Sequence, residues 1–193
     1  SDTALKADPI RVVRAVRLAV ELGFRIEPDT RKGIREVAPD VETVSVERKR
    51  DELMRCLGGP YPTSALRALD RLGVLLRVLP EWNVDESESA LAVSRTLQSL
   101  LSVLRPRHDV DAASEFALGL VAARVGRFRR ELSDYLSKSV VFTRKQIQLL
   151  YLGALLRIVG DVTRVQEGCR TLRLSKVEMK IITAMVQSEG IPV

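Results

Sequence analysis

The chain has 193 residues, of which 46% are hydrophobic and 29% charged, as is ordinary for a globular protein with one domain or two small ones. Its formal net charge of +6 permits contact with a polyanion, and its 4% of aromatic residues suits helix packing better than a base-stacking platform. No apolar run of about 18 residues, no signal peptide and no disulfide spacing is present, so the sequence argues against membrane, secreted and disulfide-scaffold classes.

The first half of the chain has apolar residues at helical spacing, interrupted by Gly and Pro. Asp8 followed by Pro9 predicts the N-cap and first residue of a helix, and Gly23 predicts its end. Further helices and a short apolar turn are expected at Pro28–Val37, Val46–Leu57, about Thr63–Leu72 and Val74–Leu79.

A polar, acidic segment, Asn83–Ser89, is the expected joint between two halves. Three or four helices should follow, at about Ala90–Leu104, Ala112–Ala123, Thr143–Ile158 and Lys176–Ser188. No segment has the alternating pattern of a strand. We therefore predict an all-α fold of two consecutive helical bundles, residues 1–82 and 83–193.

The segment Ala7–Leu18 resembles the neck motif of class II tRNA nucleotidyltransferases and bacterial poly(A) polymerases. That motif has an acid, two spacers, then arginines at three-residue steps and a Leu-Gly-Phe ending, which here is Leu22-Gly23-Phe24. Later family motifs follow in order at Val44–Arg48, Glu52-Leu53, Ala68-Leu69, Leu72–Leu75 and Leu79–Glu81. The resemblance covers about the first 82 residues. It departs from the family at Ala7, often a second acid, and at Leu18, usually an aromatic residue.

The resemblance implies nucleotide binding by Asp8, Arg11 and Arg14. A carboxylate can accept a hydrogen bond from the exocyclic amine of cytosine or adenine, while a guanidinium donates to the neighbouring ring atom. The alternative for Asp8 is a helix cap without a ligand. Arg14 meets either a triphosphate or RNA backbone, or lies on a solvated face.

A second set is expected to support the neck helix: Arg17, Glu47, Arg48 and Glu52. The alternative for Arg17 is a solvated face with an ion pair to Glu21, four residues along. Four arginines in a second basic cluster are candidates for RNA backbone contact, or else a solvated surface: Arg124, Arg127, Arg129 and Arg130. Trp82 is expected to pack at the joint.

The second half is similar to the helical domain, related to metal-dependent phosphohydrolases, that follows the neck in many of these enzymes. Where those hydrolases have His-Asp-x-Gly-Lys, this chain has Arg157–Asp161. Ser89 and the segment Gln187–Glu189 replace other expected histidine positions, and the one histidine, His108, lies elsewhere. Such metal sites need several converging ligands, so we expect a degenerate domain without metal.

The family's catalytic head, with its carboxylates for Mg²⁺, has no counterpart motif in this chain. We therefore predict no catalytic residues here, no nucleotide addition by this chain alone, and Mg²⁺ and CTP or ATP only together with a head. The expected partners are a tRNA or other RNA 3′ end and a head domain in cis or in trans, with no membrane. The start at Ser1 is taken as trimming or proteolysis, and Cys56 and Cys169 as lone buried thiols of a cytoplasmic protein. Two other functions stay open, a non-catalytic adaptor for protein–protein contact and residual phosphohydrolase activity.

Overall fold

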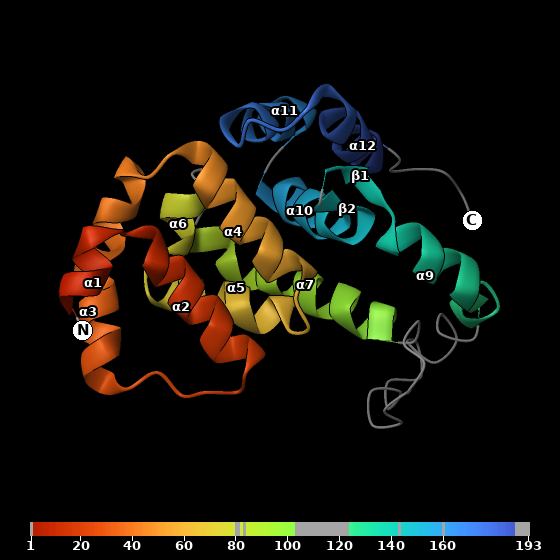
Figure 1. The fold of residues 1–193 in the computed structure, drawn as a ribbon. Coiled ribbons are helices and arrows are strands. Elements are labelled where there is room, and N and C mark those ends of the chain that lie inside the picture. The colour runs from red at the N-terminus through yellow and green to blue at the C-terminus, as the bar shows by residue number, and fades with distance from the viewer. Residues whose placement is uncertain are drawn as a thin grey trace.

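The computed structural model describes residues 2–102, apart from 80, 81 and 83, and residues 124–187, apart from 143 and 160. These ranges form an all-α fold with one small strand pair (Figure 1). The α-helices are α1 (Asp2–Ala7), α2 (Ile10–Glu21), α3 (Pro28–Val37), α4 (Val46–Gly58), α5 (Pro62–Arg71), α6 (Leu75–Val78), α7 (Ser87–Ser102), α9 (Arg129–Ser137), α10 (Gln146–Val159), α11 (Val162–Thr171) and α12 (Lys176–Gln187). Short 3₁₀ helices cover Ala38–Thr43 and Val84–Glu86.

Local signals account for the boundaries in the first half. Pro28 and Pro62 occupy the first positions of α3 and α5, where a missing N–H costs no hydrogen bond. Gly23 and Gly73, after α2 and α5, have φ values of +69° and +70°, the left-handed region that glycine adopts without strain. The predicted bounds of α3, and those of α4 and α5 within one residue, are confirmed.

The start of α2 differs from the prediction. The residue at its N-cap is Pro9, and the side chain of Asp8 makes no capping hydrogen bond. Asp8 is one position too early to reach the free N–H groups of the first turn, although its backbone carbonyl accepts from the N–H of Arg11 at 3.0 Å. The cap interpretation of Asp8 is therefore wrong.

The buried apolar side chains of both halves belong to one core. The central element is α10, which packs against α4 of the first half and against α7, α11 and α12 of the second. Leu149, Leu152 and Leu155 of α10 are fully buried, as expected for a helix that is apolar on most of its surface. The second half is thus packed onto the first through α10.

The predicted joint is tied to α5 by hydrogen bonds. The indole N–H of Trp82 donates to Asp70 at 2.7 Å, and the hydroxyl of Ser87 donates to the other oxygen of Asp70 at 2.6 Å. Trp82 is buried, so it packs at this point of the chain. The domain boundary between residues 82 and 83 stays a prediction.

Several elements were missed by the sequence reasoning. An antiparallel pair joins β1 (Ser139–Val141) and β2 (Arg144–Lys145), so the expectation of no strand is wrong. Strands this short are below the length at which an alternating pattern can be recognised. The helices α1, α9 and α11 were also not predicted. The expected helix at 112–123, and His108, lie outside the described residues.

Two predictions about burial and membranes can be compared with the described part of the chain. Cys56 and Cys169 are both buried and neither forms a disulfide, which confirms the prediction of buried thiols. No helix in the described ranges combines the length and apolar character needed to cross a membrane.

Candidate functional site

Glu52 of α4 is a buried acid on which the arginines of α2 converge. Its side chain is 2% exposed, and it accepts hydrogen bonds from Nε and Nη2 of Arg14 at 3.1 and 2.9 Å. Arg17 donates to its other oxygen at 3.2 Å, and Arg55, one turn along α4, donates at 2.6 Å. Glu52 therefore links α2 to α4 through charged groups that satisfy both of its oxygens.

The electrostatics of this network follow from its burial. Burial alone raises the pKa of Glu52, but hydrogen bonds from Arg14 and Arg17 and the charges of Arg17 and Arg55 outweigh it, so the pKa lies below its ordinary value. Burial likewise lowers the pKa of Arg17, and its bonds to Glu21 and Glu52 more than restore it. Glu52 and Arg17 are therefore both charged at neutral pH.

Arg17 differs from the solvated-face alternative. Its side chain is 12% exposed and lies between Glu52 and Glu21, the latter at 2.8 Å. The expected pairing with Glu21 is present, but it lies within the contact between α2 and α4 rather than on an open surface.

A second ion pair lies at the start of α2. Nη2 of Arg48, from α4, donates to Oδ2 of Asp8 at 2.8 Å, and Nε of Arg11 lies 3.8 Å from the same oxygen. The hydrogen bond from Arg48 is the main cause that lowers the pKa of Asp8. Arg11 and Arg48 are half-exposed, so this pair adds little to stability and faces solvent.

One oxygen of Asp8 is left for another donor. Both contacts of Asp8 are made to Oδ2, and no described residue donates a hydrogen bond to Oδ1. Besides the 3.8 Å approach of its Nε to Asp8, Arg11 makes a 3.5 Å contact from Nη1 to the carbonyl of Ala4, which leaves its Nη2 without a described partner. An exposed acceptor and an exposed donor, three residues apart on a helix, can together bind a group that presents a donor beside an acceptor.

Glu47 lies elsewhere than expected. Its carboxylate pairs with Arg173, which follows α11, and does not reach α2. The pKa of Glu47 lies below its ordinary value, first because of a backbone hydrogen bond and second because of the hydrogen bond from Arg173. Glu47 thus links α4 to the second half of the chain.

The second basic cluster is separate from the residues around α2. Figure 1 shows α9, which begins at Arg129, at the other end of the molecule from α1 and α3. Arg124, Arg127 and Arg130 are exposed, and the guanidinium of Arg127 lies 5.4 Å from the ring centre of Phe128. The cluster is accessible to an anion, but it does not join the neck network.

A second buried ion pair was missed by sequence reasoning. Arg144 of β2 donates two hydrogen bonds to Glu178 of α12, Nε to Oε1 at 2.5 Å and Nη2 to Oε2 at 2.9 Å. Glu178 is fully buried, and burial alone raises its pKa. The hydrogen bonds from Arg144 and Ser175 outweigh this effect, so the pKa lies below its ordinary value. The residues lie 34 positions apart, so no local spacing could have indicated the pair. Arg55, by contrast, follows Glu52 by three residues, a spacing that could have been recognised.

The positions that would hold metal in a phosphohydrolase have other roles. The carboxylate of Asp161 accepts from the backbone N–H of Arg164 at 3.0 Å and so caps α11. Ser89 lies in the first turn of α7. Within the described ranges, no three His, Cys, Asp or Glu side chains are grouped to hold a metal ion.

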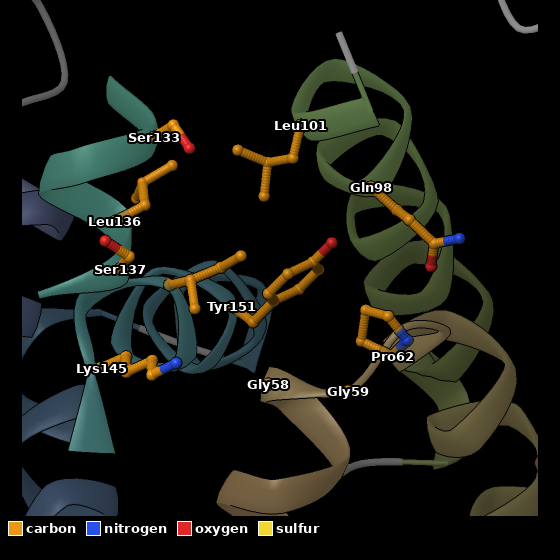
Figure 2. A pocket seen from close by; sticks show the side chains of 11 residues that line it. Gly58, Gly59, Pro62, Gln98, Leu101, Ser133, Leu136, Ser137, Lys145 and Tyr151 are labelled. Atoms are coloured by element: carbon orange, nitrogen blue, oxygen red, sulfur yellow. The ribbon is translucent and has the colours of Figure 1, made fainter. Parts of the chain in front are cut away.

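A pocket of about 290 Å³ lies between the two halves (Figure 2). It is enclosed by the turn at Gly58-Gly59, by α7 and α9, and by β2 and α10. Figure 2 shows Tyr151 between Gln98 and the serines of α9, with Lys145 at one side. Lys145 is the one charged group among the described lining residues, so they include no carboxylate, histidine or thiol for acid–base or nucleophilic chemistry.

Comparison with known proteins found similarity in the first half of the chain. The family model described as the probable RNA and SrmB-binding site of polymerase A matches residues 23–85. The chain is 39% identical over 94 residues to the CCA-adding enzyme of Geobacillus stearothermophilus, which covers 49% of this chain and 23% of that protein. It is 38% identical over 86 residues to the A-adding tRNA nucleotidyltransferase of Deinococcus radiodurans, covering 42% and 20% of the two chains.

A third relative is the CC-adding tRNA nucleotidyltransferase of Synechocystis sp., 42% identical over 71 residues, or 37% of this chain and 17% of that protein. The matched part of the chain thus spans about a fifth of the length of these relatives. Over its N-terminal half, which holds the neck motif and the network around Glu52, this chain is thus similar to CCA-adding and related tRNA nucleotidyltransferase enzymes, and residues 23–85 match the family model for the RNA-binding site of polymerase A.

Proposed function

We propose that this chain is the RNA-binding and nucleotide-selecting part of a tRNA 3′-end nucleotidyltransferase or poly(A) polymerase. In this proposal a catalytic head domain, in cis or in trans, would supply the carboxylates that hold Mg²⁺ and would transfer CMP or AMP from CTP or ATP to the RNA 3′ end, with release of pyrophosphate. The observation that carries the proposal is the pair of the partly exposed Asp8 and the exposed Arg11 at the start of α2, a helix held in place by the buried Glu52.

The chemistry of the pair favours cytosine and adenine. Both bases present an amino donor next to a ring nitrogen that accepts, which matches Oδ1 of Asp8 beside Nη2 of Arg11. Uracil and guanine present a carbonyl oxygen in place of the amine, and that oxygen would face the carboxylate. Because Arg48 holds Oδ2, the carboxylate is oriented before a nucleotide arrives, so less ordering is needed on binding.

Arg14 is placed for the remainder of the ligand. It lies one turn beyond Arg11, and its side chain is half-exposed although Glu52 holds it by two hydrogen bonds. An arginine fixed in this way can present a remaining N–H to a triphosphate or to RNA backbone.

RNA binding is tested by fluorescence anisotropy of a labelled tRNA acceptor-arm minihelix, titrated at several salt concentrations. A DNA duplex of equal length is the control. We expect tighter binding to the minihelix, weakening steeply with salt as phosphate contacts require. Equal and weak binding to both duplexes would contradict the proposed function.

Nucleotide selection is tested with this chain joined to a catalytic head. Arg11→Ala should lower the preference for CTP and ATP over UTP and GTP, whereas Arg95→Ala, at an exposed arginine of α7, should not. An unchanged preference in Arg11→Ala would show that Arg11 does not read the base.

A second candidate function is a non-catalytic adaptor for protein–protein contact. The observation in its favour is the set of exposed apolar side chains near the end of α2 and the start of α5: Leu18, Leu22 and Tyr61. A head or another protein could bury these side chains. The minihelix titration separates the two functions, because an adaptor requires no preference for RNA.

A further inference from the structure

Two adjacent hollows in the first half of the chain form one furrow between α3 and α5. The first, of about 540 Å³, is lined by Ala19, Val20, Phe24, Arg25, Ile26, Arg31, Arg35, Ser64, Arg67, Ala68, Arg71 and Leu72. The second, of about 390 Å³, continues past Arg35 and Arg71 towards Pro39 and Arg77. Because the two hollows share Arg35, Arg71 and Leu72, they suit an extended chain better than one compact molecule.

Arginines line both sides of the furrow. Arg31 and Arg35 lie one turn apart on α3, and Arg67 and Arg71 lie one turn apart on α5, so each pair projects from one face of its helix. Arg25 follows α2 at one end. These five residues are called the furrow arginines below.

The furrow arginines are not neutralised by the protein. No described residue makes an ion pair or a side-chain hydrogen bond with their guanidinium groups, and Nε of Arg67 is buried without a partner. No acid is among the described residues that line either hollow. The arginines of α2 are the opposite case, since Arg14 and Arg17 are both held by Glu52. A concentration of unpaired positive charge of this kind favours an anionic partner.

The floor and one end of the furrow are apolar. Ala19, Val20, Ile26 and Ala68 line the first hollow together with the arginines, and so does Phe24, which is 68% exposed and precedes Arg25 in the chain. Single-stranded RNA offers the matching chemistry, with phosphates for guanidinium groups and unstacked bases for an exposed ring. An acidic peptide offers the negative charges without the flat rings.

We propose that the furrow arginines bind the backbone of single-stranded RNA, with one base stacked on Phe24. This inference rests on the proposed function, and all five arginines lie within the segment that matches the family's RNA-binding region. It assigns the strand to α3 and α5, away from both the Asp8–Arg11 pair and the basic cluster beside α9.

The experiment measures binding of a labelled, unstructured RNA decamer by anisotropy across a salt series. Each neutralised phosphate contributes about −0.7 to the slope of log K against log salt for a single strand, so five contribute about −3.5. Removing Arg31 and Arg35 together should make the slope shallower by about 1.4 and weaken binding at least about tenfold. Arg67→Ala with Arg71→Ala should do the same. The matched control is Arg95→Ala with Arg170→Ala, which removes equal charge from exposed arginines of α7 and α11. Arg124→Ala with Arg130→Ala tests the other basic cluster as a rival site.

Phe24 provides a test that charge alone would not pass. Phe24→Ala should weaken binding by about 5- to 100-fold without changing the salt slope, because stacking releases no counterions. Phe24→Tyr should bind as the unchanged protein does. Circular dichroism and thermal melting verify that each variant is folded, which is expected because these side chains are outside the buried core.

The outcomes separate this proposal from the proposed function. If the furrow variants bind the decamer as the unchanged protein does while Arg124→Ala with Arg130→Ala does not, the furrow is wrong and RNA binding stands. If the unchanged protein binds the minihelix but not the decamer, the furrow is again wrong. Equal displacement of the decamer by an oligoglutamate of the same charge would overturn RNA as the occupant. Failure to bind either RNA would overturn the proposed function itself.

Discussion

Glu52→Gln tests whether the network between α2 and α4 stabilises the fold. The substitution keeps the size of the side chain but removes the negative charge that Arg14, Arg17 and Arg55 share. It also places an amide N–H₂ group where one carboxylate oxygen accepted hydrogen bonds, so that at this point an amide donor faces a guanidinium donor.

The size of the effect follows from which arginines can return to water. Arg14 and Arg55 are 50% and 55% exposed and can be hydrated again at little cost. Arg17, at 12% exposure, stays between the helices with a lost acceptor, and such charged hydrogen bonds contribute about 1.5–3 kcal/mol. We expect a loss of about 2–3 kcal/mol, less than the ~3–5 kcal/mol of a wholly buried pair.

The assay is urea unfolding followed by far-ultraviolet circular dichroism, with the free energy taken at equal m-value. The matched control is Glu21→Gln, which also removes a carboxylate from Arg17 but at a more exposed position, and should cost less than about 1 kcal/mol. If Glu52→Gln costs no more than Glu21→Gln, the argument from burial is wrong.

Three further predictions concern buried groups. Glu178→Gln should cost a similar ~2–3 kcal/mol in the same titration, because Arg144 is 13% exposed and would lose its two charged hydrogen bonds to Glu178, keeping only the 3.6 Å ion pair to Asp51; an effect below ~1 kcal/mol would contradict this. Stability should fall as the pH drops below 4.5, the ordinary pKa of a glutamate, because Glu52 and Glu178 have lowered pKa values in the folded state and the unfolded chain therefore takes up protons first. The melting temperature should fall less steeply with pH in each Gln variant. Neither Cys56 nor Cys169 should react with a thiol reagent at neutral pH until the protein unfolds, because both are buried and burial raises the pKa of Cys56 to about 12; rapid reaction of the native protein would refute their burial.

The helices of the first half could be predicted because their limits are local. Pro28 and Pro62 mark starts, and Gly23 and Gly73 mark ends, through backbone preferences that hold in any context. The helix α11 has a comparable local signal in Asp161, whose carboxylate caps it, and this residue also stands where the phosphohydrolase motif would continue, so the sequence alone does not indicate the cap.

The contacts of the candidate site could not be predicted in the same way. Arg14 and Glu52 lie 38 residues apart, and Asp8 and Arg48 lie 40 apart, so their pairing depends on how α4 packs against α2. The resemblance to known enzymes placed these residues on two neighbouring helices. It did not indicate that the acid shared by the arginines is Glu52, or that Glu47 turns away to Arg173.

The net charge of +6 does not indicate which arginines bind RNA. Whether an arginine is paired with a carboxylate of the protein does indicate this. An arginine whose charge is already balanced by a carboxylate neutralises a phosphate only weakly, so its contact releases few of the cations condensed on the RNA. Arg14 and Arg17, paired with Glu52, should therefore add little to the salt dependence of RNA binding. The unpaired furrow arginines should add nearly their full share. The slope of log affinity against log salt thus depends on the number of unpaired arginines that contact RNA, not on the total number of arginines. It therefore distinguishes a neck helix that orients a nucleotide from a furrow that binds an RNA strand.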